Sequence, residues 1–381
     1  MSPQRILKTT LSFIKNKPVF FASLFIAACS MMFVPPSEEY IGYINFKTLC
    51  QLFCLMAVVE GFKEIGVFSV IGKRLTRSVK SERGLIAALM FLTYVSGMLV
   101  TNDVALLTFV PLSITLLKQL KLEKIMIPTV ALQTIAANLG SMMMPTGNPH
   151  NLYLFGIAEM GAWEFLKLMG PYGIASVLAF AVFIPIRFGK TQIVVPKDNK
   201  KPRNLIRKKT LFYSVLFVLC MLSVYGVLDY RIVFGICFLL LLLLARETLF
   251  NVDWFLLGTF TAFFIFVGNI KQLGEVTGFL NSITAGHEIT VGIILSQFIS
   301  NVPSTLLLAG FTTDYPILMV ATDIGGLGTL IASMASLISY TFYSRTKKAS
   351  TSRYILVYSL YCLIFMAVLV ALTLLLYPKS F

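Results

Sequence analysis

Two polar interruptions inside long apolar segments most constrain what this chain can fold into. The first is Thr101-Asn102-Asp103, and the second is PTGNP at 145–149. In a lipid bilayer no water is available to satisfy the hydrogen bonds of a broken backbone. Irregular backbone at that depth is tolerated only where it is buried in protein or lines a cavity, and there it often holds bound solutes and ions. The interruptions therefore predict a membrane protein whose polar site lies at the breaks.

Composition supports a membrane protein. Hydrophobic residues make up 57% of the chain and charged residues 13%, whereas a soluble domain has roughly 45–50% and about 25%. The formal net charge is still +15, and the basic surplus lies between the apolar segments. In a membrane protein, such a surplus indicates which loops face the cytoplasm and is weak evidence for a nucleic-acid partner. We therefore expect no nucleic acid. The six cysteines lie in apolar segments without a C-x-x-C pair, so we expect buried thiols.

A looser copy of both interruptions occurs later in the chain. SNVP at 300–303 corresponds to the first, and DIGGLGT at 323–329, followed by Ser333, corresponds to the second. Each arm around the first interruption has about 17 residues, fewer than the roughly 20 of a full span, so a re-entrant hairpin is favoured over two spans. We expect hairpins at 84–120 and 288–311, and helices broken in the middle at 125–160 and 316–343.

Loop charges predict the orientation. The linker 189–209 holds eight basic residues against Asp198 alone, and the loop after the second span is also basic, whereas the loops with Glu38 and Glu159 are acidic. By the positive-inside rule the N-terminus and the linker are cytoplasmic and the C-terminus is external. We expect a first half at 1–188, this linker, and a second half at 210–381 that begins with a linking span.

The predicted fold class is an all-α polytopic membrane protein with about nine transmembrane spans and two hairpins. The span at 41–71 is long, so it should be tilted or bent around Gly61 and Gly66. Because the two halves have opposite orientation and each holds a hairpin followed by a broken helix, they match the inverted-repeat plan of secondary transporters.

The candidate binding residues are the small and polar residues of the four breaks. Carbonyl and hydroxyl groups suit a small cation, and backbone N–H groups at half-helix N-termini suit an anion. The alternative is that these residues only cap half-helices. The candidates are Thr101, Asn102, Asp103, Asn138, Ser141, Thr146, Gly147, Asn148, Asn151, Ser300, Asn301, Asp323, Gly325, Gly326, Thr329 and Ser333. Within this set, Na⁺ ligands would be Asn102, Asp103, Asn148 and Asn301; we expect no other metal.

Asp103 is the most informative candidate. A carboxylate at membrane depth costs about 2.5–3.5 kcal/mol even on the lenient insertion scale, which implies a role or a partner. Charged, it attracts a cation; protonated, it carries a proton; alternatively it only caps the returning arm. Asp323 should lie nearer the external interface, beside Asp314. His150 is close enough to the first break to touch the site, whereas His287 should be an external loop residue.

These motifs resemble the ion transporter superfamily of arsenite permeases, citrate transporter-like proteins, sodium/proton antiporters and divalent anion/sodium symporters. TNDVALLTFVPL at 101–112 is similar to the first hairpin tip, GNPHNL at 147–152 to the G-N-P-x-N-L break, and SNVP at 300–303 to the second tip. The resemblance implies a scaffold and a moving transport domain, a homodimer, and an elevator movement. The second break has no clean G-x-x-N pattern and so departs from the family's second cation site. Asp103 replaces the Thr of the dicarboxylate symporters, which favours the arsenite and citrate-type branch.

We therefore expect a secondary active transporter in the cytoplasmic (inner) membrane. Its substrate would be a small anion or oxyanion, citrate-like, dicarboxylate-like or arsenite-like, coupled to Na⁺ or H⁺, with no other cofactor. A Na⁺/H⁺ antiporter of the same superfamily is the alternative, and an ion channel is the alternative from another class. We expect no enzyme, because the sequence has no H-E-x-x-H or comparable motif and its two histidines lie far apart in the chain. No arginine lies in any break, so the sequence leaves the substrate open.

Overall fold

The computed structural model describes residues 17–77, 79–194 and 207–378, and every regular element there is a helix. The described residues form nineteen α-helices, α2 to α20, and one 3-10 helix. One isolated β-bridge joins Ser81 to Gln192. The predicted all-helical class is confirmed. The middle of the basic linker, 195–206, lies outside the described residues.

The N-terminal part contains α2 (Pro18–Ser30), α3 (Glu39–Tyr43), α4 (Phe46–Ile65) and α5 (Val67–Arg77). Gly66 separates α4 from α5 with φ +78°, a left-handed conformation that glycine adopts without steric cost. The expected bend is therefore at Gly66. Gly61 lies inside α4, against the ring of Tyr213, and ends no helix.

The first hairpin and broken helix follow. They consist of α6 (Glu82–Leu99), α7 (Asn102–Gln119), the 3-10 helix η1 (Glu123–Ile125), α8 (Met126–Ser141), α9 (Pro149–Ile157) and α10 (Ala162–Arg187). Ser81 begins α6 by accepting a hydrogen bond from the Gly84 N–H, and Thr101 does the same for α7 with the Val104 N–H. Pro149 begins α9, where its missing N–H costs no hydrogen bond. The break between the two half-helices therefore runs from 142 to 148.

The second half contains α11 (Arg207–Val224), α12 (Tyr230–Leu244), α13 (Arg246–Phe250), α14 (Trp254–Lys271), α15 (Gly274–Thr284), α16 (Glu288–Ile299), α17 (Asn301–Leu308), α18 (Tyr315–Gly325), α19 (Met334–Ser344) and α20 (Thr351–Leu376). Only Ser300 separates α16 from α17, and eight residues, 326–333, separate α18 from α19. Asp253 and Asp314 accept backbone N–H groups at the starts of α14 and α18. The second half therefore has the same order of a helix pair followed by a divided helix.

By length and composition, four of the described helices could cross a membrane: α6, α10, α14 and α20. Other apolar helices, such as α2, α12, α16 and α18, are shorter. The described part of the chain thus contains several helices of membrane length, and the count of nine spans stays a prediction. Half-helices fall short because each break divides one apolar segment into two pieces.

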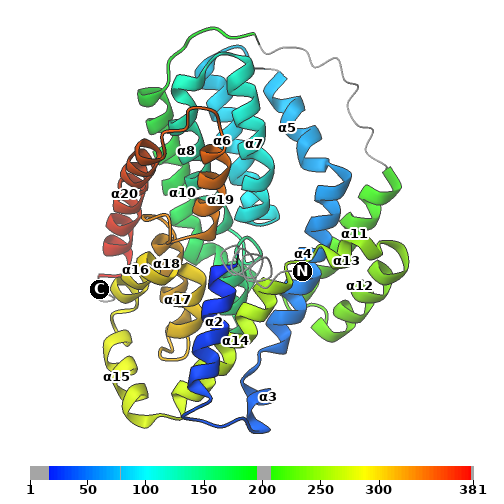
Figure 1. Ribbon diagram of the computed structural model, residues 1–381, viewed down its shortest axis with the longest axis vertical. Helices are drawn as coiled ribbons and strands as arrows, with labels where there is room; N and C mark the ends of the chain where they lie inside the picture. Colours follow the sequence, from blue (N-terminus) through cyan, green and yellow to red (C-terminus); the bar gives the residue numbers. More distant parts are fainter. Residues whose placement is uncertain (1–16, 78, 195–206, 379–381) are drawn as a thin grey trace, which may run out of the picture.

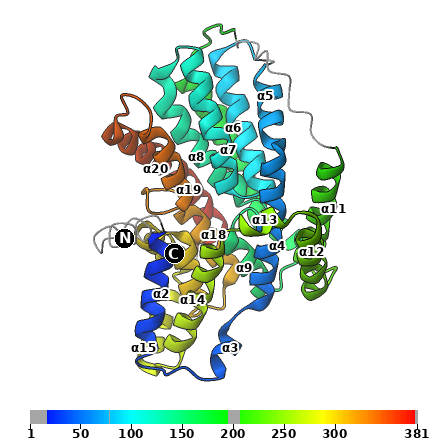
Figure 2. The same ribbon diagram turned by 45° about the vertical axis from the view of Figure 1, so that its right-hand side comes forward.

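The two hairpins interlock with the broken helices (Figures 1 and 2). The α6–α7 pair packs on α8 and lies in the upper part of Figure 1, whereas the α16–α17 pair packs on α18 in the lower part. Each half-helix that follows a break crosses to the opposite hairpin: α19 contacts α7 and α8, and α9 contacts α17 and α18. A separate group, α4 with α11, α12 and α13, lies to one side.

The centre of the interlocked body is α8. All its residues except Ile127 are buried, and most are small or polar. A Cβ atom on Gly140 would lie 2.1 Å from the Tyr94 carbonyl oxygen of α6, so only glycine permits this close approach of the two helices. The tight packing of α6 on α8 fixes the position of the first hairpin tip.

Candidate functional site

The first tip is bound to the first break through Asn102. Its backbone N–H donates to the Gly147 carbonyl oxygen at 3.3 Å, and its side-chain Nδ2 donates to Asn138 Oδ1 at 3.1 Å. Its Oδ1 accepts the Asp103 backbone N–H at 2.9 Å. Asn102 thus connects the start of α7, the end of α8 and the break loop, which is more than a cap requires.

The second tip is bound in the same manner through Asn301. Its backbone N–H donates to the Ala332 carbonyl oxygen at 2.9 Å, and its Oδ1 accepts the Val302 N–H at 3.0 Å. The preceding Ser300 has φ +75° and ψ 153°, a conformation that is essentially restricted to glycine. The Ser300 Oγ donates a weaker hydrogen bond to the Ala332 carbonyl oxygen at 3.4 Å. The second tip is therefore strained and is held by the break beside it.

Two reciprocal hydrogen bonds connect the breaks. Asn148 and Ser333 occupy the N-cap positions of α9 and α19, but neither side chain caps its own helix. Instead, Asn148 Nδ2 donates to Asp323 Oδ1 at 3.1 Å, and Ser333 Oγ donates to Asn138 Oδ1 at 3.2 Å. Asn138 lies near the end of α8 and Asp323 near the end of α18. In both cases a side chain at the start of the second half-helix of one half donates to a side chain near the end of the first half-helix of the other half.

Asp323 is the centre of a fully enclosed cluster. Besides Asn148, it accepts Asn151 Nδ2 at 2.8 Å, and His150 Nε2 lies 3.2 Å from its Oδ1. The exposed fractions of His150 and Asn151 are 0%, and that of Asp323 is 5%. The expectation that Asp323 lies beside Asp314 is wrong, because Asp314 begins α18 and Asp323 lies near its other end. Loop charge predicted a position near the surface for Asp323, whereas the two donors, Asn148 and Asn151, bind it inside the protein.

A cavity of about 360 Å³ opens beside the first tip. Thr101, Asp103, Thr146 and Pro149 line it from the hairpin and the break. α4 contributes Leu52, Leu55, Met56, Val59, Glu60 and Lys63 to the opposite wall. The Asp103 Oδ1 is buried and has no hydrogen-bond partner among the described residues. Asp103 is therefore available to a bound ion or solute.

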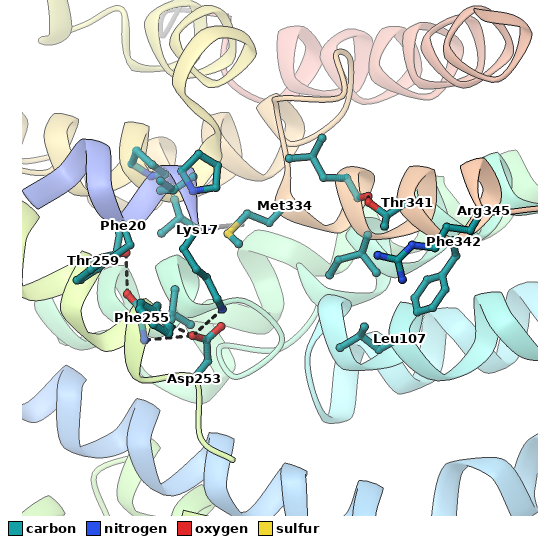
Figure 3. A pocket seen from close by; sticks show the side chains of 17 residues that line it. Lys17, Phe20, Leu107, Asp253, Phe255, Thr259, Met334, Thr341, Phe342 and Arg345 are labelled. Carbon is teal, nitrogen blue, oxygen red and sulfur yellow. Dashed lines mark hydrogen bonds and ion pairs between the residues drawn. The ribbon is translucent and has the colours of Figure 1, made fainter. Parts of the chain in front are cut away.

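A second cavity of about 350 Å³ lies beside the second tip (Figure 3). Val302, Pro303 and Met334 line it from the tip and from α19. Lys17 and Asp253 line both cavities and form an ion pair at 3.4 Å, which Figure 3 shows between the two side chains. Lys17 Nζ also lies 4.8 Å from the centre of the Phe255 ring. The two tips thus face neighbouring spaces that share one charged pair.

The structure brings together most of the residues predicted from the sequence. Asn102, Asn138, Gly147, Gly326 and Ser333 belong to one hydrogen-bonded group, because Asn138 Nδ2 also donates to the Gly326 carbonyl oxygen at 3.4 Å. Asn148, Asn151 and Asp323 form a second group, and Ser300 with Asn301 forms the second tip. Thr101, Asp103 and Thr146 lie on the cavity wall.

Three predicted residues serve local roles. Ser141 Oγ donates to the Asn138 carbonyl oxygen within its own helix, and Gly325 permits close packing of α18 on Ser296. Thr329 is exposed and bonded to Gln297 through both its N–H and its hydroxyl, so it lies outside the two buried groups.

Sequence reasoning missed Gln297, Lys17 and Asp253. Gln297 Nε2 donates to the carbonyl oxygens of Gly325 and Leu327, at 2.8 and 3.1 Å, and thereby supports the second break. The sequence feature that could have indicated this role is the position of Gln297, a polar residue three positions before the second tip. Lys17 and Asp253 gave no signal, because they are separated from the breaks in sequence and meet them only through folding.

Comparisons with known proteins agree with the transporter resemblance. The family described as citrate transporter matches residues 10–314. An uncharacterized transporter of Methanocaldococcus jannaschii is 30% identical over 360 residues, which cover 93% of this chain and 96% of the relative. The inner membrane protein YbiR of Escherichia coli is 30% identical over 332 residues, or 84% of this chain and 86% of the relative. A transporter of Dictyostelium discoideum named arsB is 23% identical over 153 residues, or 40% of this chain and 27% of the relative.

Proposed function

The chain belongs to the citrate transporter family, and from that premise we propose that it is a secondary active transporter for a small anion or oxyanion. The family assignment makes it a membrane transporter and not an enzyme, with a small molecule or an ion as its substrate. It also confirms the resemblance that the break motifs indicated. The proposal adds the solute class, the coupling to Na⁺ or H⁺ and the alternating-access mechanism.

The reciprocal hydrogen bonds between the breaks carry the proposal. Ser333 donates to Asn138, and Asn148 donates to Asp323, so the half-helices of one half are tied to those of the other. Two hairpin tips bound to these breaks would then move as one body with the solute. This arrangement supports an inverted repeat at 1–188 and 210–381, with binding residues at both tips. A channel would instead need a continuous pore.

The position of the first cavity supports an elevator movement. Its walls come from the first tip and break on one side and from α4 on the other. A solute bound there would lie between the interlocked body and a neighbouring helix group, so sliding of one against the other would change its access. We propose that α4 belongs to the scaffold, and that the protein works as a homodimer in the cytoplasmic membrane.

Charges of both signs line the cavities. Lys17 and Lys63 line the first cavity together with Glu60, Asp103 and Asp253, and Lys17 and Arg345 line the second together with Asp253. Lys17 pairs with Asp253 and Lys63 with Glu60, so a citrate-like or oxyanionic solute would compete with these carboxylates for the lysines and would also use the half-helix dipoles. Asp103, with its unpartnered oxygen, would take the coupling cation or proton. A Na⁺/H⁺ antiporter would use Asp103 without the basic residues.

Solid-supported-membrane currents would test the proposal most economically. Proteoliposomes would be challenged with citrate, C4-dicarboxylates, sulfate, arsenite and sodium, each with and without a pH gradient. We expect saturable currents with one anion or oxyanion that depend on a Na⁺ or H⁺ gradient. Currents with sodium alone under a pH gradient would instead favour the antiporter, and currents that never saturate would favour a channel.

A further inference from the structure

One wall of the second cavity is a continuous stripe of side chains on α19. The stripe residues follow the spacing i, i+3, i+4, i+7, i+8 and i+11, which is one face of an α-helix. They are Met334, Leu337, Ile338, Thr341, Phe342 and Arg345. Since α19 has 11 residues and Arg345 follows directly as its C-cap residue, the stripe extends for about 16 Å along the helix axis. The second cavity therefore follows the whole length of α19 and has a guanidinium group at one end.

The two cavities differ in what the hairpin tips contribute to them. The first tip contributes the polar side chains of Thr101 and Asp103 to the first cavity, whereas the second tip contributes Val302 and Pro303 to the second cavity. The wall that faces α19 comes from α2 and α14 and is also largely apolar, with side chains such as Phe20. Covering apolar surface with hydrocarbon is favourable, whereas a small hydrophilic ion finds no hydrogen-bond partners on it. The second cavity therefore suits a ligand with a hydrocarbon part.

Most polar groups that line the second cavity already have partners. The hydroxyl groups of Thr259 and Thr341 donate to carbonyl oxygens of their own helices, at 2.8 and 2.7 Å. Lys17 pairs with Asp253 at 3.4 Å. Arg345 is exposed and forms no hydrogen bond or ion pair with another described residue. Figure 3 shows it on the opposite side of the cavity from the Lys17–Asp253 pair. The Arg345 guanidinium is therefore available to an anionic group.

The sequence around Arg345 adds to the positive charge at this end of the cavity. Lys347, Lys348 and Arg353 follow it, and residues 345–381 contain no Asp or Glu. By the positive-inside rule this loop faces the cytoplasm, and the cytoplasmic leaflet carries anionic lipids. Basic pockets between membrane helices on that side bind anionic lipid head groups. Charge and orientation thus both indicate a lipid anion.

We propose that the second cavity binds one anionic phospholipid of the cytoplasmic leaflet. Its phosphate group would accept hydrogen bonds from the Arg345 guanidinium, which matches phosphate in shape and charge. One acyl chain would cover the apolar stripe from Phe342 to Met334. A small anion could also bind Arg345 but would leave that stripe uncovered. The proposal goes beyond the proposed transport function, because it assigns a second ligand and does not depend on the transported solute.

Native mass spectrometry of the detergent-solubilised protein would measure this binding without a transport assay. The protein would be titrated with dioleoyl phosphatidylglycerol and with dioleoyl phosphatidylcholine, which has the same acyl chains and no net charge. We expect phosphatidylglycerol to bind more tightly than phosphatidylcholine, and Arg345→Gln to raise its Kd at least about fivefold. Equal binding of the two lipids, or unchanged binding by Arg345→Gln, would overturn the proposal.

Lys347→Gln is the matched control for the charge. Lys347 is exposed, lies two residues after Arg345 in the same loop and does not line the cavity. Its substitution should leave the Kd for phosphatidylglycerol within about twofold of wild type. A loss as large as that of Arg345→Gln would show that the lipid responds to the net charge of the loop, and would refute a site at Arg345.

Leu337→Trp tests the apolar wall. Leu337 is 39% exposed, so a larger side chain fits there without disturbing the core, and it narrows the second cavity. Phosphatidylglycerol should bind at least about fivefold more weakly, because acyl-chain contacts are lost. Leu356→Trp is the control, since Leu356 lies on α20, is 70% exposed and does not line the cavity. Wild-type affinity in Leu337→Trp would contradict the position of the acyl chain.

Competition with small anions separates a lipid from a hydrophilic solute. Inorganic phosphate and citrate match only the guanidinium group, so at concentrations equal to that of the lipid they should not displace phosphatidylglycerol. Displacement by either one would show that Arg345 serves a small anion, and the lipid site would be rejected. These measurements are independent of the proposed function, because a chain that transports none of the tested solutes can still bind the lipid.

Discussion

Single asparagines connect each hairpin tip to the break beside it. Asn102 contacts Asn138 and Gly147, and Asn301 contacts Ala332. Both side chains also accept the N–H of the residue that follows them, so both tips share this local hydrogen bond. This agreement between distant segments is the residue-scale basis for placing a solute at the tips.

Asn102→Ala and Asn301→Ala should each reduce transport at least about tenfold. Asn102→Ala removes the side-chain hydrogen bonds to Asn138 and to the Asp103 N–H, and Asn301→Ala removes the one to the Val302 N–H, whereas the backbone hydrogen bonds of both residues to the breaks remain. The cost is about 1–2 kcal/mol in stability, which leaves the protein folded. Uptake into proteoliposomes and a thermal melt would measure the two effects. Asn45→Ala is the control, because Asn45 caps α4 and accepts the Thr48 N–H at 2.9 Å. It should cost about 1 kcal/mol of stability without loss of uptake. Near-normal uptake by either tip variant would make that tip structural.

Asp103→Asn should abolish coupled accumulation while exchange of solute persists. The substitution keeps the shape of the side chain but fixes it as neutral, and the unpartnered Oδ1 beside the cavity loses its charge. Gradient-driven uptake across roughly pH 5.5–8.5 would measure the effect. The alternative that Asp103 caps α7 is wrong, because Thr101 is the N-cap and accepts the Val104 N–H. Uptake by Asp103→Asn with the wild-type pH dependence is the outcome that rules out a coupling role.

At the scale of helices, the break at 142–148 depends on the close approach of Gly147 to the backbone of Ser141. A Cβ atom on Gly147 would lie 2.1 Å from the Ser141 carbonyl oxygen, which is backbone and cannot rotate away. Gly147→Ala should therefore destabilise the protein by roughly 1–3 kcal/mol, as overpacking does. Gly156→Ala, in α9, is the matched control because nothing lies within 4 Å of its added Cβ. It should be neutral or stabilising by up to about 1 kcal/mol. Thermal melts would compare the two, and equal stability would show that the break tolerates a side chain.

The breaks and hairpins were the parts of the fold most open to prediction from the sequence. Polar residues and prolines inside apolar runs have few structural meanings in a membrane, so Pro149 and Asn301 were predicted to lie in interruptions, and the structure begins α9 and α17 at these two residues. The role of Asp323 was harder to predict because its partners, Asn148 and Asn151, lie 175 and 172 residues away. Loop charge suggested that Asp323 lies near the surface, whereas packing of α9 on α18 places it inside. Lys17 reaches the cavities through the packing of α2 on α14, which no local pattern encodes.

At the scale of the whole molecule, the proposed alternating access requires the two halves to have opposite orientation. A cysteine introduced at Asp198 in the basic linker should react with an impermeant reagent only after the cells are permeabilised. A cysteine at Ser37, in the acidic loop between α2 and α3, should react in intact cells. Reaction of the linker cysteine before permeabilisation would contradict the proposed orientation.

We propose that the tips and breaks form one solute-carrying body that alternates its access. Counterflow in proteoliposomes tests this most directly, with labelled citrate or arsenite outside and the same unlabelled solute inside. We expect saturable uptake that the internal solute accelerates, and loss of that acceleration in Asn102→Ala and Asn301→Ala. Uptake that rises linearly with concentration and is indifferent to internal solute would contradict it.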